Sequence, residues 1–334
     1  MRAWLMDSYN GVETLRLGEV PDPRPGPNDL LLNMRFAALN PADAFLASGM
    51  YPAKPHLPHI LGRDGVGDVA AVGADVRDVR SGDTVGILRC DVGVEVWGTL
   101  AEKVVVPAQS VARIPQGWSF EEMTAAPLVF LTAWQALTQW TDPPAPPPPG
   151  STVLVTGASG GVGVASVLLG KSMNLTVVAL SRSGGKQARL KELGADFVFD
   201  PNGPHLAKVI GGALAPKKLD LVIDSVGGAL FPHLIGLLGY GGRMSVVGRS
   251  GGPVPEFNTA TLLFRRIRVG GVSVGDYSAQ QAQAIWKEIV GRLGAIGRRP
   301  QIDVIVPFEK VKEGFHRLAQ GPMGKVLVRA PNGK

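Results

Sequence analysis

The pattern of apolar and polar positions changes along the chain. Over roughly the first 115 residues, short apolar runs such as 30–36 and 66–72 lie between glycine and proline turn signals. Such runs are typical of strands, so we predict a β-rich module. Residues 120–140 have a helical pattern instead, and the proline-rich residues 143–150 then exclude both a helix and a central strand. We interpret residues 143–150 as a stiff surface connection.

From residue 151 onward, short apolar runs alternate with longer segments that can form helices. Uninterrupted apolar runs are typical of parallel strands buried on both faces, and the intervening segments are long enough for crossover helices. We therefore predict an α/β domain with a doubly wound parallel sheet. Its expected strands contain residues 153–155, 177–180, 197–199, 221–223 and 245–247.

The C-terminal part of the chain predicts one amphipathic helix and two strands. Apolar residues recur three and four positions apart over residues 282–293, as on one face of a helix. The apolar runs 302–306 and 325–328 follow. We expect these two strands to join the N-terminal β module.

Length and composition narrow the class of protein. A chain of 334 residues with 45% apolar and 19% charged residues can form two globular domains. Its single cysteine, Cys90, excludes an internal disulfide and any structural zinc site built from three or four thiolates. No signal-peptide pattern opens the sequence, and glycines and Lys171 interrupt the most apolar stretch, residues 151–181. We expect a cytoplasmic protein with no membrane segment.

The charge pattern does not favour a nucleic-acid partner. The net charge is +6, from 34 Lys and Arg against 28 Asp and Glu, and the densest cationic site is residues 265–268. The cations are dispersed rather than gathered in one basic run, and a polyanionic cofactor is a sufficient reason for part of them.

The strongest functional signal is a glycine-rich turn between a strand and a helix. Residues 153–163 are Val-Leu-Val-Thr-Gly-Ala-Ser-Gly-Gly-Val-Gly. Dinucleotide folds need such glycines for a tight turn, for close approach of backbone to a pyrophosphate, and for helix amides that face the anion. The β-α units that follow supply the context that this motif requires. We predict cofactor contacts from Ser159, Gly160, Gly161 and Val162.

The residues after the second strand of this domain favour NADPH over NADH. An NAD site places an acid here for the ribose hydroxyls, whereas an NADP site needs cations and hydroxyls for the 2′-phosphate. The sequence has no acid at this point and has Ser181, Arg182 and Lys186 instead. The alternative is a helix N-terminus with ordinary solvated charges.

Motifs spread over nearly the whole chain resemble the medium-chain dehydrogenase/reductases. The likeness is to their zinc-independent branch, the zeta-crystallin-like quinone oxidoreductases and the enoyl thioester reductases. It rests on Asn-Pro-Ala-Asp at 40–43, Gly-Arg-Asp-Gly-Val-Gly at 62–67, Gly-Thr-Leu-Ala-Glu at 98–102, the glycine turn, and Gly-Lys-Val at 324–326. The order of these motifs makes the set specific.

The resemblance implies the domain organisation. A GroES-like catalytic domain would comprise residues 1–119 and 275–334, and a Rossmann NADP-binding domain would comprise residues 120–274, with a cofactor cleft at their junction. It also implies a homodimer through the edge of the Rossmann sheet, for which residues 269–272 are the candidate edge.

The sequence departs from the zinc-dependent members of the superfamily. Those members carry a cysteine in the stretch that corresponds to residues 38–43 and a His-Glu pair where this chain has Arg63 and Asp64. The five histidines and Cys90 show no spacing that would build a site of three ligands. We therefore predict no metal. Without a Lewis acid, reduction of an already activated acceptor is favoured over alcohol oxidation.

The resemblance also implies residues for catalysis. Hydride can pass to a quinone or to the β-carbon of an α,β-unsaturated carbonyl, and the acceptor then needs a hydrogen-bond donor or a proton. Tyr51 matches a donor near the substrate, Asn40 a residue by the nicotinamide ribose, and Thr132 a residue near the nicotinamide amide. The alternatives are a Tyr51 hydroxyl on a backbone carbonyl, an Asn-Pro turn at Asn40, and a helix N-terminal position for Thr132.

Further cofactor contacts are expected at the carboxyl edge of the sheet, where dinucleotides lie. Lys325 matches a terminal basic residue that can reach the cofactor phosphates, and a surface lysine is the alternative. The remaining expected contacts are Ser225 after the fourth strand, Val247, Gly248 and Arg249 after the fifth, and Val272, Ser273 and Val274 after the sixth.

We predict an NADPH-dependent oxidoreductase that transfers a hydride to a quinone. A reductase of 2-enoyl thioesters or alkenals is the alternative among enzymes, because the fold, Tyr51 and NADPH serve both. A low-turnover NADPH-binding or RNA-binding protein is a third hypothesis, supported by the net charge and residues 265–268 alone.

Overall fold

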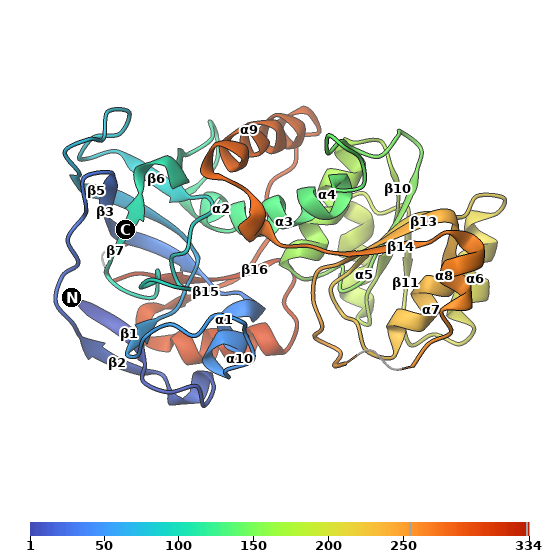
Figure 1. The fold of residues 1–334 in the computed structure, drawn as a ribbon, viewed down its shortest axis with the longest axis horizontal. Coiled ribbons are helices and arrows are strands. Elements are labelled where there is room, and N and C mark those ends of the chain that lie inside the picture. The colour runs from blue at the N-terminus through green and yellow to red at the C-terminus, as the bar shows by residue number, and fades with distance from the viewer. Residues whose placement is uncertain (254–255, 332, 334) are drawn as a thin grey trace. The chain divides into compact units, whose positions relative to one another are not determined.

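The computed structural model describes residues 1–253, 256–331 and 333. The chain divides into two compact units, which Figure 1 shows coloured along the sequence. Unit 1 comprises Met1–Leu128, Gly275–Lys287 and Arg299–Lys334, and unit 2 comprises Val129–Val274 and Glu288–Arg298.

This division differs from the predicted boundaries in two segments. Residues 120–128 belong to unit 1, because helix α2 (Phe120–Thr124) packs against strands β3, β5 and β6 of that unit. Helix α9 (Ala279–Ala295) runs from unit 1 into unit 2. The helical pattern of residues 120–140 also forms two helices rather than one, since a break precedes Pro127, where α3 (Pro127–Thr138) begins.

A seven-stranded sheet forms the larger part of unit 1. Its strand order is β15-β16-β3-β5-β6-β8, and β7 also pairs with β3. The two C-terminal strands join β3, as predicted: β16 runs antiparallel to β3, and β15 lies beside β16. The strands are β3 (Asp29–Ala38), β5 (Asp64–Val72), β6 (Thr84–Ile87), β7 (Lys103–Pro107), β8 (Val111–Arg113), β15 (Ile302–Pro307) and β16 (Lys325–Arg329).

A smaller sheet and two helices complete unit 1. The sheet has the order β2-β1-β4, and its apolar side chains share one core with residues from both ends of the chain. Its strands are β1 (Arg2–Met6), β2 (Arg16–Glu19) and β4 (His59–Ile60), and the helices are α1 (Pro41–Ala47) and α10 (Val311–Ala319). Single 3₁₀ turns lie at η1 (Val12–Thr14), η2 (Ala108–Ser110), η3 (Val274–Asp276) and η4 (Phe308–Lys310).

Unit 2 contains the predicted parallel sheet, with six strands in the order β11-β10-β9-β12-β13-β14. All neighbouring strands are parallel, and the central strand β9 is buried along its whole length because its residues are apolar or hydrogen-bonded. The strands are β9 (Thr152–Val155), β10 (Thr176–Leu180), β11 (Phe197–Phe199), β12 (Leu219–Asp224), β13 (Leu238–Val246) and β14 (Arg268–Gly271).

The strand order of unit 2 places the expected ligand site. In chain order it reads 3-2-1-4-5-6, so the chain moves outward from β9 in one direction and from β12 in the other. Doubly wound sheets bind dinucleotides beyond the carboxyl ends of the two strands where this direction changes. The remaining helices are α4 (Gly161–Ser172), α5 (Gly184–Glu192), α6 (Leu206–Leu214), α7 (Leu230–Leu237) and α8 (Ala260–Arg265). Within the described ranges, no helix combines the length and the apolar character that a membrane span requires.

Candidate active site

The glycine turn of unit 2 has the geometry of a dinucleotide site. Gly157 adopts the left-handed backbone conformation, with φ of 56°, and Gly160 is the N-cap of α4. A Cβ on Gly163 would lie 2.3 Å from the carbonyl oxygen of Gly157, so only glycine lets α4 pack this closely against the turn. The residues present therefore fit a pyrophosphate, whose charge the first amides of α4 would face.

A buried carboxylate, which the sequence analysis missed, fixes the two loops at this point. Asp224 ends β12 with no exposed surface. Its carboxylate accepts hydrogen bonds from the Thr156 hydroxyl at 2.7 Å and from the backbone amides of Val226 and Gly227 at 3.0 and 3.1 Å. It thereby ties the loop after β9 to the loop after β12. An acid directly after the apolar run 221–223 was the available signal.

The residues predicted to bind the adenosine ribose phosphate lie in the loop at the carboxyl end of β10 and in the first turn of the helix after it. Ser181 is buried, and its backbone amide donates to the carbonyl of Phe199. Arg182 is exposed, and no carboxylate pairs with it in the described part of the chain. Lys186 lies in the first turn of α5. The loop therefore offers a cation and a hydroxyl group, and no acid.

The other predicted cofactor residues lie on the carboxyl edge of the same sheet or on α3. Thr132 lies in the middle of α3, so the helix N-terminal position considered for it is wrong. Contacts of these residues with a cofactor stay predictions. Ser225 follows β12, Val247, Gly248 and Arg249 follow β13, and Val272, Ser273 and Val274 follow β14.

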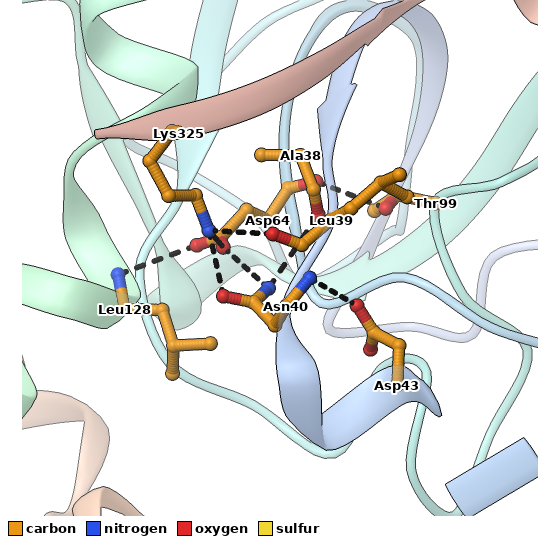
Figure 2. A network of polar contacts seen from close by, with 8 residues as sticks. All are labelled: Ala38, Leu39, Asn40, Asp43, Asp64, Thr99, Leu128 and Lys325. Atoms are coloured by element: carbon orange, nitrogen blue, oxygen red, sulfur yellow. Dashed lines mark hydrogen bonds and ion pairs between the residues drawn. The ribbon is translucent and has the colours of Figure 1, made fainter. Parts of the chain in front are cut away.

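In unit 1, the strand register gathers three polar side chains at one end of the larger sheet. Ala38 at the end of β3 pairs with Asp64 on β5 and with Leu327 on β16. Asn40 lies two residues beyond Ala38, and Lys325 lies two residues before Leu327. Residues from three distant segments therefore meet, as Figure 2 shows.

The three side chains form a buried ion pair that an amide bridges. Lys325 Nζ lies 3.0 Å from Asp64 Oδ2 and donates to Asn40 Oδ1 at 2.6 Å and to the carbonyl of Leu39 at 3.2 Å. Asn40 Nδ2 donates to Asp64 Oδ2 at 2.9 Å. The side chains of Lys325 and Asp64 are 4% and 1% exposed. A charge pair this deep is stable only when both partners have their hydrogen bonds, as they do here.

Asp64 also holds the first turn of α3 and the loop that contains Thr99. Its Oδ1 accepts a hydrogen bond from the backbone amide of Leu128 at 3.3 Å, and its carbonyl accepts one from the Thr99 hydroxyl at 2.9 Å. No structural role was predicted for Asp64, which entered the sequence-based argument as part of the 62–67 motif and as a departure from a zinc site. An acid directly before a run of glycine and valine was the missed signal.

The structure overturns one alternative, for Lys325, and supports another, for Asn40. Lys325 is not a surface lysine, and its three ammonium protons all have acceptors within unit 1. This arrangement does not favour the predicted contact with cofactor phosphates. Asn40 is the N-cap of α1, directly before Pro41 at the first helical position. Its backbone therefore follows the Asn-Pro alternative, while its side chain belongs to the ion pair.

A second polar group, formed by Tyr51, Arg63 and Asp43, lies beside this network. Arg63 Nη1 donates to the Tyr51 hydroxyl at 3.3 Å. Among the described residues this hydroxyl donates to no backbone carbonyl, as the alternative would require. Asp43 Oδ2 accepts a hydrogen bond from the backbone amide of Asn40 at 2.8 Å. Asp43 Oδ1 and Arg63 Nε are buried and have no partner.

Burial changes the acidity of Asp43. The loss of solvent raises the pKa of its carboxyl to about 6, because the charged form is disfavoured, although Arg63 and Lys325 oppose this effect and Asp64 adds to it. The group therefore gains a proton far more readily than an exposed aspartate.

The donor set at this place does not fit a metal ion. No group of three or more His, Cys, Asp and Glu side chains is arranged to hold a metal among the residues that the structure describes. Arg63 and Lys325 also bring two positive charges to this group of residues, which disfavours a bound cation. The absence of a metal stays a prediction.

Two family models match the chain in succession. The model described as "Alcohol dehydrogenase GroES-like domain" matches residues 26–116, and the one described as "Zinc-binding dehydrogenase" matches residues 161–291. The quinone oxidoreductase of Lama guanicoe is 28% identical over 331 residues, which are 98% of this chain and 97% of the relative.

Two solved structures are similar over almost the whole chain. The structure of an NAD-dependent alcohol dehydrogenase has a TM-score of 0.89 and 32% identity, and the match covers 98% of this chain and 99% of the other. The quinone oxidoreductase from Thermus thermophilus, which was also solved in complex with NADPH, has a TM-score of 0.78 and 31% identity. The match covers 98% of this chain and 100% of the other.

We expect Lys325→Met to destabilise the protein by about 3–5 kcal/mol, because it leaves the Asp64 carboxylate buried and unpaired. Lys310→Met is the control: Lys310 pairs with Glu313 on the surface, and its loss costs about 0–1 kcal/mol. The Asp64→Asn/Lys325→Met double variant should recover part of the lost free energy of unfolding, because it leaves no unpaired charge. Chemical unfolding followed by circular dichroism measures all three variants. Equal losses for Lys325→Met and Lys310→Met would contradict the role of the pair.

Asp43→Asn should gain stability relative to the wild type as the pH rises from 4 to 8. The folded-state pKa of about 6 lies above the ordinary value of 3.8, so the folded protein binds this proton more tightly and loses that stability as the pH rises through this window. The shift corresponds to roughly 3 kcal/mol at most. Thermal unfolding at pH 5 and pH 8 measures the difference, with exposed Asp75→Asn as the control. If the unfolding temperatures of wild type and Asp43→Asn differed by the same amount at pH 5 and pH 8, the raised pKa of Asp43 would be contradicted.

Proposed function

Because this chain belongs to the medium-chain dehydrogenase/reductase superfamily and is an oxidoreductase like its quinone oxidoreductase members, we propose that it reduces quinones with NADPH. A small-molecule acceptor and a nicotinamide dinucleotide are what an oxidoreductase of this fold uses. The choice of quinone and of NADPH is the proposal.

The hydrogen bond at Tyr51 carries the proposal for the acceptor. Arg63 donates into the Tyr51 oxygen, which leaves the Tyr51 O–H proton available for another acceptor. A quinone that takes up a hydride gains negative charge on oxygen, and a positioned O–H group stabilises that charge and can transfer its proton. The relatives named quinone oxidoreductase support the same acceptor.

The loop after β10 supports NADPH. The 2′-phosphate that distinguishes NADPH from NADH carries about two negative charges, and Arg182 is an exposed cation at the place where this phosphate binds in such folds. One similar solved structure contains NADPH and another is named NAD-dependent, so the residues of this loop carry the choice. When bound, NADPH supplies the hydride.

The chain's own residues then have three tasks. The glycine turn and the carboxyl edge of the parallel sheet bind the dinucleotide. Tyr51 donates a hydrogen bond and then a proton to the acceptor oxygen, and solvent replaces that proton. Asn40, fixed by Lys325 and Asp64, holds the first turn of α1 in place. The sum is NADPH, quinone and one proton converted to NADP⁺ and hydroquinone.

Reduction of a 2-enoyl thioester or an alkenal is the second candidate. It uses the same hydride donor, and Tyr51 would then protonate the enolate formed after hydride addition to the β-carbon. An enolate is less stable than the anion of an aromatic hydroquinone. Enoyl reduction therefore depends more strongly on the Tyr51 proton than quinone reduction does.

We also propose a homodimer through the edge of the unit 2 sheet. Strand β14 is the terminal strand of that sheet, and an unpaired strand edge favours pairing with a second copy. On α8 and β14, Leu263, Phe264 and Val269 are 72%, 77% and 41% exposed. Such a group of exposed apolar side chains is typical of an interface.

Tyr51→Phe should lower kcat/KM for an ortho-quinone by about tenfold and for a medium-chain trans-2-enoyl thioester by about 10²–10³, since it removes one donor to a developing oxyanion. Tyr9→Phe is the control, because the Tyr9 hydroxyl donates to the Pro55 carbonyl instead. NADPH oxidation is followed by absorbance. No turnover of the quinone by the wild type would refute the proposed function, and faster turnover of the thioester would favour the second candidate.

Arg182→Ala should weaken NADPH binding by roughly 10–100-fold and leave NADH binding unchanged, since a hydrogen bond to a charged group contributes about 1.5–3 kcal/mol. The control is Arg189→Ala on α5, the helix that follows Arg182 in the chain, where Arg189 pairs with Glu192. Titrations of cofactor fluorescence give both dissociation constants. Equal affinities of the wild type for the two cofactors would overturn the choice of NADPH.

Light scattering of the purified protein should give twice the mass of one chain. Phe264→Glu with Val269→Asp should shift it to the monomer, because charges would replace the apolar contact. Leu17→Glu, an exposed apolar residue in unit 1, should have no effect. A wild-type monomer at micromolar concentration would exclude this dimer.

A further inference from the structure

Arg63, which is half-buried, differs from the buried cation Lys325 of unit 1 in having no ion-pair partner. Lys325 has a carboxylate at 3.0 Å and two further acceptors. In the described residues, no carboxylate pairs with Arg63, whose single side-chain hydrogen bond goes to the Tyr51 hydroxyl. Its Nε is buried without an acceptor. A buried donor atom without an acceptor is costly, and an anionic acceptor would compensate both that atom and the charge of the guanidinium.

Arg63 and Tyr51 are placed so that the guanidinium donates a hydrogen bond to the phenol oxygen. The guanidinium lies 5.9 Å from the centre of the Tyr51 ring, and Nη1 donates into the phenol oxygen. A donor that is positively charged polarises the phenol, so the Tyr51 O–H becomes a stronger donor in turn. The pair therefore presents donors and a positive charge, and no acceptor other than the occupied phenol oxygen.

Asp43 contributes a negative charge to this region without forming an ion pair with Arg63. Four ionisable groups face one another here: Arg63 and Lys325 carry positive charge, and Asp43 and Asp64 carry negative charge. Asp64 is bound to Lys325, and Asp43 keeps one buried carboxylate oxygen without a partner. An added negative charge would therefore be neutralised if Asp43 took up a proton.

We propose that Arg63 and Tyr51 together form an oxyanion-binding subsite, which selects quinone-like ligands with a negatively charged oxygen over neutral ligands of the same size. This inference rests on the proposed function in that the bound oxygen is the one that gains charge when the acceptor takes the hydride. Arg63 stabilises that charge, and Tyr51 supplies the proton that converts the oxyanion to a hydroxyl.

Equilibrium binding tests this subsite without turnover. The probes are 2-hydroxy-1,4-naphthoquinone, which is an anion at neutral pH, and its neutral methyl ether of nearly the same size. We expect the wild type to bind the anion at least tenfold more tightly in calorimetric titrations at pH 7, with and without NADP⁺. Arg63→Gln should abolish this preference, and Arg63→Lys should restore part of it.

Matched variants separate a binding role from a structural one. Arg77→Gln changes an exposed arginine of the same unit, whose guanidinium contacts the Ala74 carbonyl, and should keep the preference. NADPH binding and the unfolding temperature should be unchanged in Arg63→Gln. Titrations in two buffers of different ionisation enthalpy should show proton uptake with the anion near pH 7, and Asp43→Asn should abolish that uptake.

The outcomes distinguish this proposal from the proposed function. An anion preference that survives in Arg63→Gln, equal affinity of the wild type for the two probes, or no binding of either would overturn the subsite. If the anion preference depends on Arg63 but the wild type does not oxidise NADPH with any quinone, the subsite stands and the quinone reductase function fails.

Discussion

The ion pair between Lys325 and Asp64 is the interaction on which the candidate active site depends. It joins the first residues of β16 and β5, bridges to the N-cap of α1 through Asn40, and reaches the first turn of α3 through the Leu128 amide. The burial that makes this pair strong also makes it intolerant of a missing partner. One neutralised pair therefore orients four elements and leaves Arg63 as the remaining cation beside Tyr51.

The two units differ in the groups that would compensate a negative charge. In unit 2, backbone amides at the start of α4 face the position of a pyrophosphate, and close packing of glycines brings them there. In unit 1, side chains carry the charge, and its balance depends on a carboxyl group that titrates close to neutral pH. The charge distribution of the first arrangement does not depend on pH, whereas that of the second changes as Asp43 titrates.

The fold and the glycine turn of unit 2 could be predicted from the sequence, because both arise from local patterns. Apolar runs of strand length and the glycine turn determine the parallel sheet and its binding edge. The network of unit 1 could not be predicted, because its members are far apart in the chain and each is an ordinary polar residue. Lys325 was expected at the surface or the cofactor, and only the register of β3 with β5 and β16 brings it to Asp64.

The order of these segments along the chain has a consequence for synthesis on the ribosome. Asp64 and Lys325 are 261 residues apart, and at about 5–20 residues per second the carboxylate waits roughly 13–50 s for its ammonium. All six strands of the unit 2 sheet emerge within that interval. The parallel sheet can therefore form while the first β module is still incomplete, and arrival of the last strand is the event that closes unit 1.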